Sequence, residues 1–157
     1  MSQTNWKDKA ELVGLAAIIA SLFLVAYELR QNTIASRQEA AVTYATTSRD
    51  IDLFVVGNPE FSSLLKKVIS EQEVSPDEWF RLSIFYRSVL RSWQDTHYQY
   101  LTGTLDEEIW DAEHRFMREI LEEDPGFSRF WANGNNVWFT NEFQSLIEQT
   151  LDDINAN

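Results

Sequence analysis

The chain has 157 residues, of which 44% are hydrophobic and 13% aromatic, so it carries enough apolar material for one folded core and is not intrinsically disordered. It contains no cysteine, which excludes disulfides, iron–sulfur clusters, thiolate zinc sites and cysteine nucleophiles. Three basic and three acidic residues balance in residues 1–30, so the net charge of −12 lies wholly in residues 31–157. A region this acidic repels phosphate backbones, and we expect no nucleic-acid partner.

An uncharged apolar run extends from Leu12 to Tyr27 and reads LVGLAAIIASLFLVAY. As a helix these residues would span roughly 24 Å at about 1.5 Å per residue, slightly less than a hydrocarbon core of about 30 Å. Flanking side chains suited to the membrane interface lengthen the span. They are Trp6, Lys7, Lys9, Tyr27 and Arg30. We therefore predict a short N-terminal tail at 1–11, a transmembrane helix at 12–27 and an acidic helical domain at 28–157.

Three other interpretations of the run are weaker. A buried core helix would show polar residues at helical spacing, whereas only Ser21 interrupts this run. A cleaved signal peptide fits Lys7 and Lys9 before an apolar stretch, but no small-x-small cleavage site directly follows. An amphipathic helix that lies in the membrane plane needs a charged face, and this run contains no charged residue. Two basic residues lie near each end of the run, so the positive-inside rule does not decide the orientation.

Small residues in the run recur at a spacing of four. They are Ala16 and Ala20, Ala17 and Ser21, with Gly14 nearby. Small side chains at that spacing let helix backbones approach closely in lipid. They predict a helix-packing face toward a second copy or another subunit, although Ala and Gly are also ordinary components of spanning helices.

No glycine or proline follows the run until Gly57, so we expect one long helix to continue from the membrane segment to about Val56. Its apolar stripe consists of Ile34, Ala41, Tyr44, Ile51 and Val55, with Arg37 and Ser48 filling the remaining positions. Proline and capping residues then predict further helices over 59–70, 75–101, 104–123, 124–131 and from 140 onward, with a loop at 133–136.

Capping boxes are expected to begin the second and third of these helices, at Ser75-Pro76-Asp77-Glu78 and at Thr104-Leu105-Asp106-Glu107. In the helix over 104–123, Leu105, Ile109, Phe116 and Ile120 are expected to point inward. No segment shows strand alternation, and the connections are short. The predicted fold is all-α: an N-terminal transmembrane helix continuing into a small antiparallel helical bundle.

Few residues suggest chemistry. Asp111 and His114 have the i, i+3 spacing of helical metal sites, but the motif occurs once, whereas di-metal bundles use it twice. His97 lies on an apolar stripe and is better explained as a core histidine. No nucleophile elbow and no phosphate-binding loop occurs, so we expect no catalytic residues, no metal, no cofactor and no enzyme activity.

Two clusters remain open. The carboxylates of Glu119, Glu122, Glu123 and Asp124 form either a solvated helix end or a surface for partner docking or cation binding. A second cluster consists of the aromatic residues Trp93, Tyr98, Tyr100 and Trp110. These side chains line either a pocket for a small apolar molecule or an ordinary core.

The junction Leu29-Arg30-Gln31-Asn32-Thr33 resembles a group of uncharacterised bacterial single-span membrane proteins that carry "LRQNT" after the N-terminal helix. The later Tyr98-Gln99-Tyr100, Gly103 and Leu105–Trp110 are similar to that group as well. The resemblance implies the bacterial inner (cytoplasmic) membrane, with the helical domain on the cytoplasmic side. Because the group has no established activity, the resemblance implies no functional residues.

These features favour a non-enzymatic, membrane-anchored scaffold or accessory subunit of a larger membrane assembly, or a homo-oligomer. Its expected partners are the lipid bilayer and other membrane subunits or itself. The second hypothesis is a membrane-proximal binding module for a hydrophobic ligand, and the third is a metal-dependent enzyme that uses Asp111 and His114.

Overall fold

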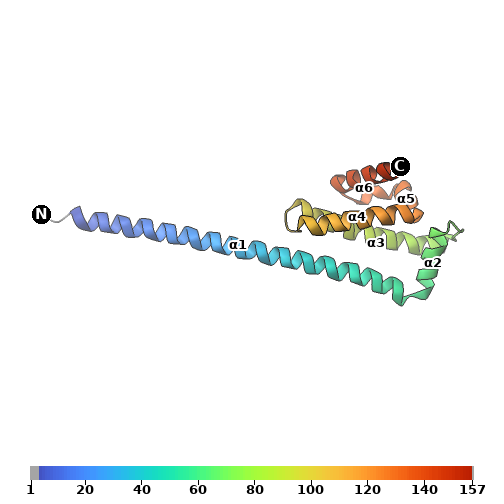
Figure 1. The fold of residues 1–157 in the computed structure, drawn as a ribbon, viewed down its shortest axis with the longest axis horizontal. Helices are drawn as coiled ribbons and strands as arrows, with labels where there is room; N and C mark the ends of the chain where they lie inside the picture. The colour runs from blue at the N-terminus through green and yellow to red at the C-terminus, as the bar shows by residue number, and fades with distance from the viewer. Residues whose placement is uncertain (1–3, 157) are drawn as a thin grey trace. The chain divides into compact units, whose positions relative to one another are not determined.

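The computed structural model describes residues 4–156, which form six α-helices, one 3-10 turn and no strand. With 88% of the chain helical, the structure confirms an all-α fold in which one long apolar N-terminal helix precedes a helical bundle. The elements are α1 (Thr4–Gly57), α2 (Pro59–Ile69), α3 (Pro76–Leu101), α4 (Glu107–Glu123), α5 (Pro125–Ala132), η1 (Asn135–Trp138) and α6 (Asn141–Asn155), as labelled in Figure 1.

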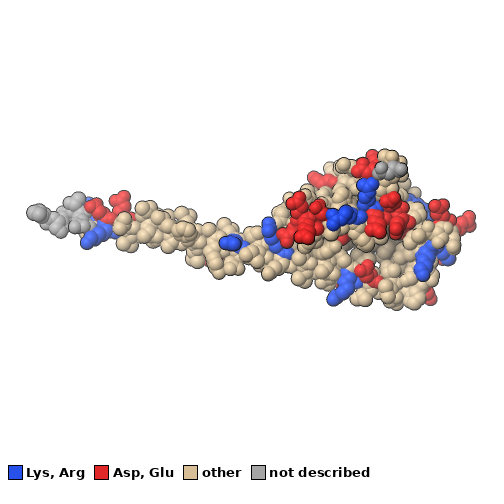
Figure 2. Space-filling view, in the orientation of Figure 1, with Lys and Arg blue, Asp and Glu red and all other residues tan. Residues whose placement is uncertain are grey.

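The chain divides into two units, residues 1–39 and 40–157, and α1 contributes to both. In the first unit every described side chain is exposed, and the run 12–27 shows as a tan stretch without charges in Figure 2. α1 is the one helix among the described residues that is long and apolar enough to cross a membrane, a property that signal sequences and soluble core helices share.

The boundaries of the first unit differ from the expected ones. The helix already begins at Thr4, so residues 4–11 of the expected tail are helical, while residues 1–3 lie outside the described part. The second unit begins at Ala40 rather than at residue 28. The physical reason is continuity, because no proline stands between Thr4 and Gly57 to interrupt the helix, and Gly14 lies within it.

Most helix starts in the second unit are where the sequence places them. Asn58 caps α2 through a 3.2 Å bond from the Phe61 backbone N–H, and Ser75 with Glu78 forms the full capping box of α3. Thr140 caps α6. Gly103, with φ +73°, ends the turn after α3 in the left-handed conformation expected of a glycine stop.

The predicted start of α4 is wrong. The helix begins at Glu107 with Asp106 in the cap position, and the expected cap, Thr104, donates its hydroxyl to the Gln99 carbonyl at 3.0 Å instead. The loop turns back onto the end of α3, so Thr104 caps that helix end. The expected loop 133–136 likewise contains the start of the short η1 turn.

The core of the second unit is mainly aromatic and lies among α2 to α6. α3 and α4 run in opposite directions (Figure 1), and α3 also packs against α2 and α5. The most deeply buried large side chains are Tyr86, Phe130, Phe143, Leu82, Leu90, Met117 and Ile147. The buried face of α4 consists of Trp110, Glu113, Met117 and Leu121, so the expected inward position of Phe116 is wrong, and half of its surface is exposed.

Candidate ligand-binding cavity

A cavity of about 720 Å³ lies within the second unit, between the last turns of α1 and helices α2 to α5. Most of its wall is apolar. The apolar lining residues are Ile51, Val55, Val56, Leu65, Ile69, Phe85, Val89, Trp93, Ala112, Phe116, Ile120 and Phe127. Ligand pockets in proteins typically have volumes of about 300–1,000 Å³ and mostly apolar walls, so this cavity has the size and character of a small-molecule site.

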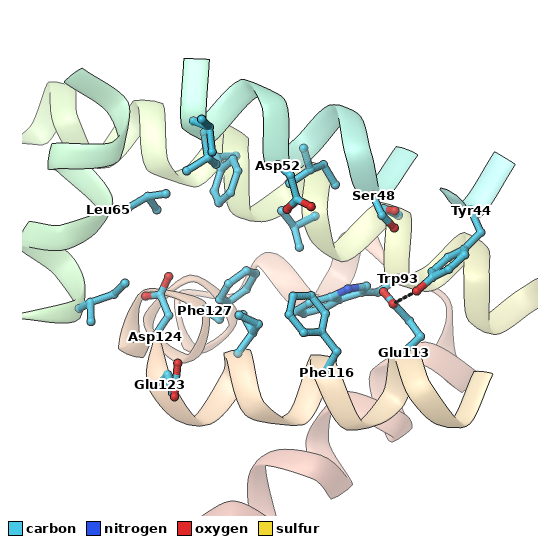
Figure 3. Close-up of a pocket in the computed structure, with 18 of the residues that line it drawn as sticks. Tyr44, Ser48, Asp52, Leu65, Trp93, Glu113, Phe116, Glu123, Asp124 and Phe127 are labelled. Atoms are coloured by element: carbon cyan, nitrogen blue, oxygen red, sulfur yellow. Dashed lines mark hydrogen bonds between the residues drawn. The ribbon is translucent and has the colours of Figure 1, made fainter. Parts of the chain in front are cut away.

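One wall comes from the stripe that the sequence predicts on α1. Tyr44, Ser48, Ile51 and Val55 follow each other at spacings of four, three and four, which places them on one face of the helix. In Figure 3 Tyr44, Ser48 and Asp52 extend from this helix toward α4. The stripe therefore lines the cavity, while Ile51 and Val55 also pack against the edge of the hydrophobic core.

A buried carboxylate lies at one end of the cavity. Glu113 is 6% exposed and accepts a 2.6 Å hydrogen bond from the Tyr44 hydroxyl, drawn as the dashed line in Figure 3. Burial raises the pKa of Glu113, and the neighbouring polar groups of Tyr44 and Trp93 oppose that rise. Burial and the neighbouring carboxylate raise the pKa of Tyr44 to about 12, so Tyr44 stays a hydrogen-bond donor at neutral pH.

A second buried carboxylate lies near the other end, where α4 meets α5 (Figure 3). The two oxygens of Asp124 accept from the Tyr86 hydroxyl at 3.1 Å each, and one also accepts from the Gly126 backbone N–H at 2.8 Å. Burial raises the pKa of Asp124 as well. This network fixes the first turn of α5 and places Phe127 against the rings of Tyr86 and Trp93.

The aromatic pocket considered from the sequence is not present in that form. Tyr98 is 66% exposed, and Trp110 is buried in a stack with Tyr100 at 5.1 Å and His114 at 5.4 Å between ring centroids. Of the four residues only Trp93 lines the cavity. Periodicity alone places aromatic side chains on a face, and it does not distinguish stacked rings from cavity walls.

Of the residues considered for a metal site, His97 and His114 are half-buried and stacked on Trp110, whereas Asp111 is exposed. His97 lies 5.0 Å from the Trp110 ring centroid and 6.2 Å from that of Phe143, as expected of a core histidine. Burial lowers the pKa of His97 and also that of His114. Within the described part of the chain, no three His, Asp or Glu side chains are grouped so as to hold a metal ion.

The expected docking patch is divided by the structure. Glu119, Glu122 and Glu123 are exposed on α4, whereas Asp124 is buried as the cap of α5 and does not belong to that surface. Figure 2 shows acidic side chains of the second unit grouped with basic ones on the visible face.

The small residues of the predicted helix-packing face are all exposed in the first unit. They are Gly14, Ala16, Ala17, Ala20 and Ser21. Ser21 donates its hydroxyl to the Ala17 carbonyl at 2.9 Å.

Glu113, Asp52 and Asp124 were not identified as cavity residues from the sequence. A signal for Glu113 does exist, because it falls between Trp110 and Met117 on the apolar face of α4, where a carboxylate is unexpected. No sequence feature indicates that α1 would leave a space opposite that face.

Fold and site together define a class of protein. It is all-helical, with one described helix long and apolar enough to span a membrane. Its helical domain contains a mainly apolar cavity with a buried carboxylate near each end. Comparison with family models, with curated proteins and with solved structures gives no match to this chain.

Proposed function

We propose that this protein is a membrane-anchored, non-enzymatic binding module that holds a hydrophobic ligand in the cavity of its helical domain. The observation that carries the proposal is the volume of about 720 Å³ among mainly apolar side chains. Ligand pockets in proteins are mostly apolar and typically have volumes of about 300–1,000 Å³, so a space of this size with this lining is suited to a bound molecule.

The apolar run supports the anchored part of the proposal. In this account residues 12–27 span the bacterial inner membrane, with interface side chains at both ends. Seventeen positions separate Tyr27 from Tyr44, the first cavity residue, and a chain of that length reaches at most about 60 Å even when fully extended. The anchor therefore ties the helical domain to a bilayer in which hydrophobic molecules accumulate, and the "LRQNT" resemblance favours the cytoplasmic side.

Ser48→Trp is expected to abolish ligand binding, because Ser48 lines the cavity from α1 and an indole there would occupy the ligand's volume. The matched control is Ala45→Trp, on the same helix but exposed and outside the cavity lining. Both variants and the wild type would be extracted with their own lipid in polymer nanodiscs and analysed by native mass spectrometry. We expect a non-covalent adduct on the wild type and on Ala45→Trp, and its loss from Ser48→Trp.

An adduct that Ser48→Trp retains at the wild-type level would mean that the ligand binds elsewhere, and no adduct on any of the three chains would remove the proposal. Circular dichroism of the three chains would establish that the indole has not unfolded the domain.

A scaffold or accessory subunit is the second candidate, favoured by apolar side chains that the domain leaves exposed. Leu53, Phe54 and Val56 at the end of α1 and Phe80 on α3 are each about half or more exposed. A second groove of about 560 Å³ lies between α1 and α3, and Phe54 is one of its lining residues. Exposed apolar patches of this kind mark interaction surfaces. The same spectra test this candidate: a second chain at fixed stoichiometry would support it, and a bare monomer would count against it.

A further inference from the structure

Among the described residues, the charged side chains that line the cavity all have the same sign. They are the carboxylates of Asp52, Glu113, Glu123 and Asp124, and no lysine, arginine or histidine of this part of the chain belongs to the lining. The remaining polar groups are the hydroxyls of Tyr44, Ser48 and Ser92. A cavity with apolar walls and only negative charges repels carboxylate and phosphate head groups and attracts a cation.

Glu113 is the carboxylate best placed to meet such a cation. It is almost fully buried, it lines the cavity, and its polar neighbours, the Tyr44 hydroxyl and the Trp93 indole, are neutral. A buried carboxylate without a cationic partner is costly, and each carboxylate oxygen can accept more than one hydrogen bond. A ligand ammonium would supply the missing positive charge.

The aromatic lining suits the same kind of ligand. The rings of Trp93 and Phe127 stack at 5.3 Å between centroids, and in Figure 3 Phe116 lies beside Trp93 near the Glu113 end. Aromatic faces attract cations and provide large apolar contact areas. Asp124 is less suited as the partner, because both of its oxygens accept from Tyr86 or the Gly126 backbone and its side chain forms the N-cap of α5.

We propose that the ligand is a hydrophobic amine, an alkyl or aryl chain ending in a basic nitrogen, and that its ammonium group pairs with Glu113 while its chain fills the apolar cavity. This inference rests on the proposed function and narrows it to one chemical class. The chain would pack between the stripe of α1 and the facing residues of α4, and the nitrogen would lie near the Tyr44–Glu113 bond.

The test uses three probes with the same eight-carbon chain: octylammonium, octanol and octanoate. Each is titrated by calorimetry at neutral pH into the full chain in zwitterionic nanodiscs, with empty discs subtracted. We expect octylammonium to bind at least about tenfold tighter than octanoate, equivalent to about 1.4 kcal/mol, with octanol in between. Glu113→Gln keeps an oxygen acceptor for Tyr44, and it should remove most of the ammonium's advantage while leaving octanol binding in place.

Glu119→Gln, which changes an exposed carboxylate of α4 outside the cavity lining, serves as the matched control and should leave all three affinities unchanged. Equal binding of the three probes would overturn the amine inference and leave the hydrophobic-ligand function standing. Binding of none of them would overturn both. An ammonium preference that survives Glu113→Gln would overturn the assignment to Glu113.

Discussion

Gly126→Ala is expected to destabilise the helical domain by about 2–3 kcal/mol, in the upper range for overpacking a buried site. A methyl group at this position would overlap the hydroxyl and the ring carbon of Tyr86 and would lie 2.8 Å from a carboxylate oxygen of Asp124. Tyr86 is fully buried and donates to Asp124, so neither group can move without breaking a buried hydrogen bond. Thermal unfolding of the full chain in mild detergent, followed by near-ultraviolet circular dichroism, measures the loss.

Gly57→Ala is the control for that prediction. Nothing lies within 4 Å of a methyl group built on Gly57, so its effect should not exceed a few tenths of a kcal/mol. The double variant Tyr86→Phe/Gly126→Ala removes the clashing hydroxyl and should recover part of the stability. If the Gly126→Ala chain unfolded at the same temperature as the wild type, α5 could not begin in contact with Tyr86.

Ile19→Arg combined with Leu22→Arg is expected to release the chain from the membrane. An arginine at the centre of a spanning helix costs about 2.5–3.5 kcal/mol on insertion scales, and two of them outweigh the apolar contribution of a run of only 16 residues. The measurement is alkaline carbonate extraction of cell membranes. The wild type should stay in the membrane pellet, and the double variant should appear in the soluble fraction.

Ile34→Arg, outside the apolar run, provides the control and should stay in the pellet. The intact mass of the membrane-bound chain distinguishes an anchor from a cleaved signal sequence, because an anchored chain retains residues 12–27. A membrane-bound mass that lacks this segment would contradict the anchor, and so would a soluble wild-type chain.

The sequence predicts the helices well because their signals are local. A capping side chain, a proline at the first turn or a glycine at a positive φ acts within a few residues, which is why α2, α3, α5 and α6 begin where Asn58, Ser75, Asp124 and Thr140 indicate. The start of α4 was mispredicted because two candidate caps stand two residues apart, and the fold of the loop onto α3 uses Thr104 for another bond.

The cavity could be predicted only in part. The stripe on α1 identifies Tyr44, Ser48, Ile51 and Val55 as facing the rest of the domain, and this much follows from helical spacing. Whether such a face packs tightly or leaves space depends on how the helices are arranged in three dimensions, which periodicity does not encode. The position of Glu113 opposite Tyr44, 69 residues away, is a long-range contact of this kind.

The cavity also changes which function the protein is best suited to. From the sequence alone, the small-residue face and the acidic charge favour a scaffold or accessory subunit. The structure adds a volume with apolar walls, so a binding module becomes the better-supported proposal, and the exposed apolar groups at the end of α1 keep the scaffold as the second.

Photolabelling tests the central claim, that the cavity binds a hydrophobic ligand, most directly. A long-chain alcohol with a diazirine at the end of its chain would be added to membranes that contain the full chain, activated by light, and its attachment sites mapped by mass spectrometry. The account predicts labels on cavity-lining residues of α1 and α4, such as Ile51, Val55 and Phe116, and competition for these labels by unlabelled alcohol. Labels confined to residues 12–27, or to the exposed Val137 and Trp138, would contradict it.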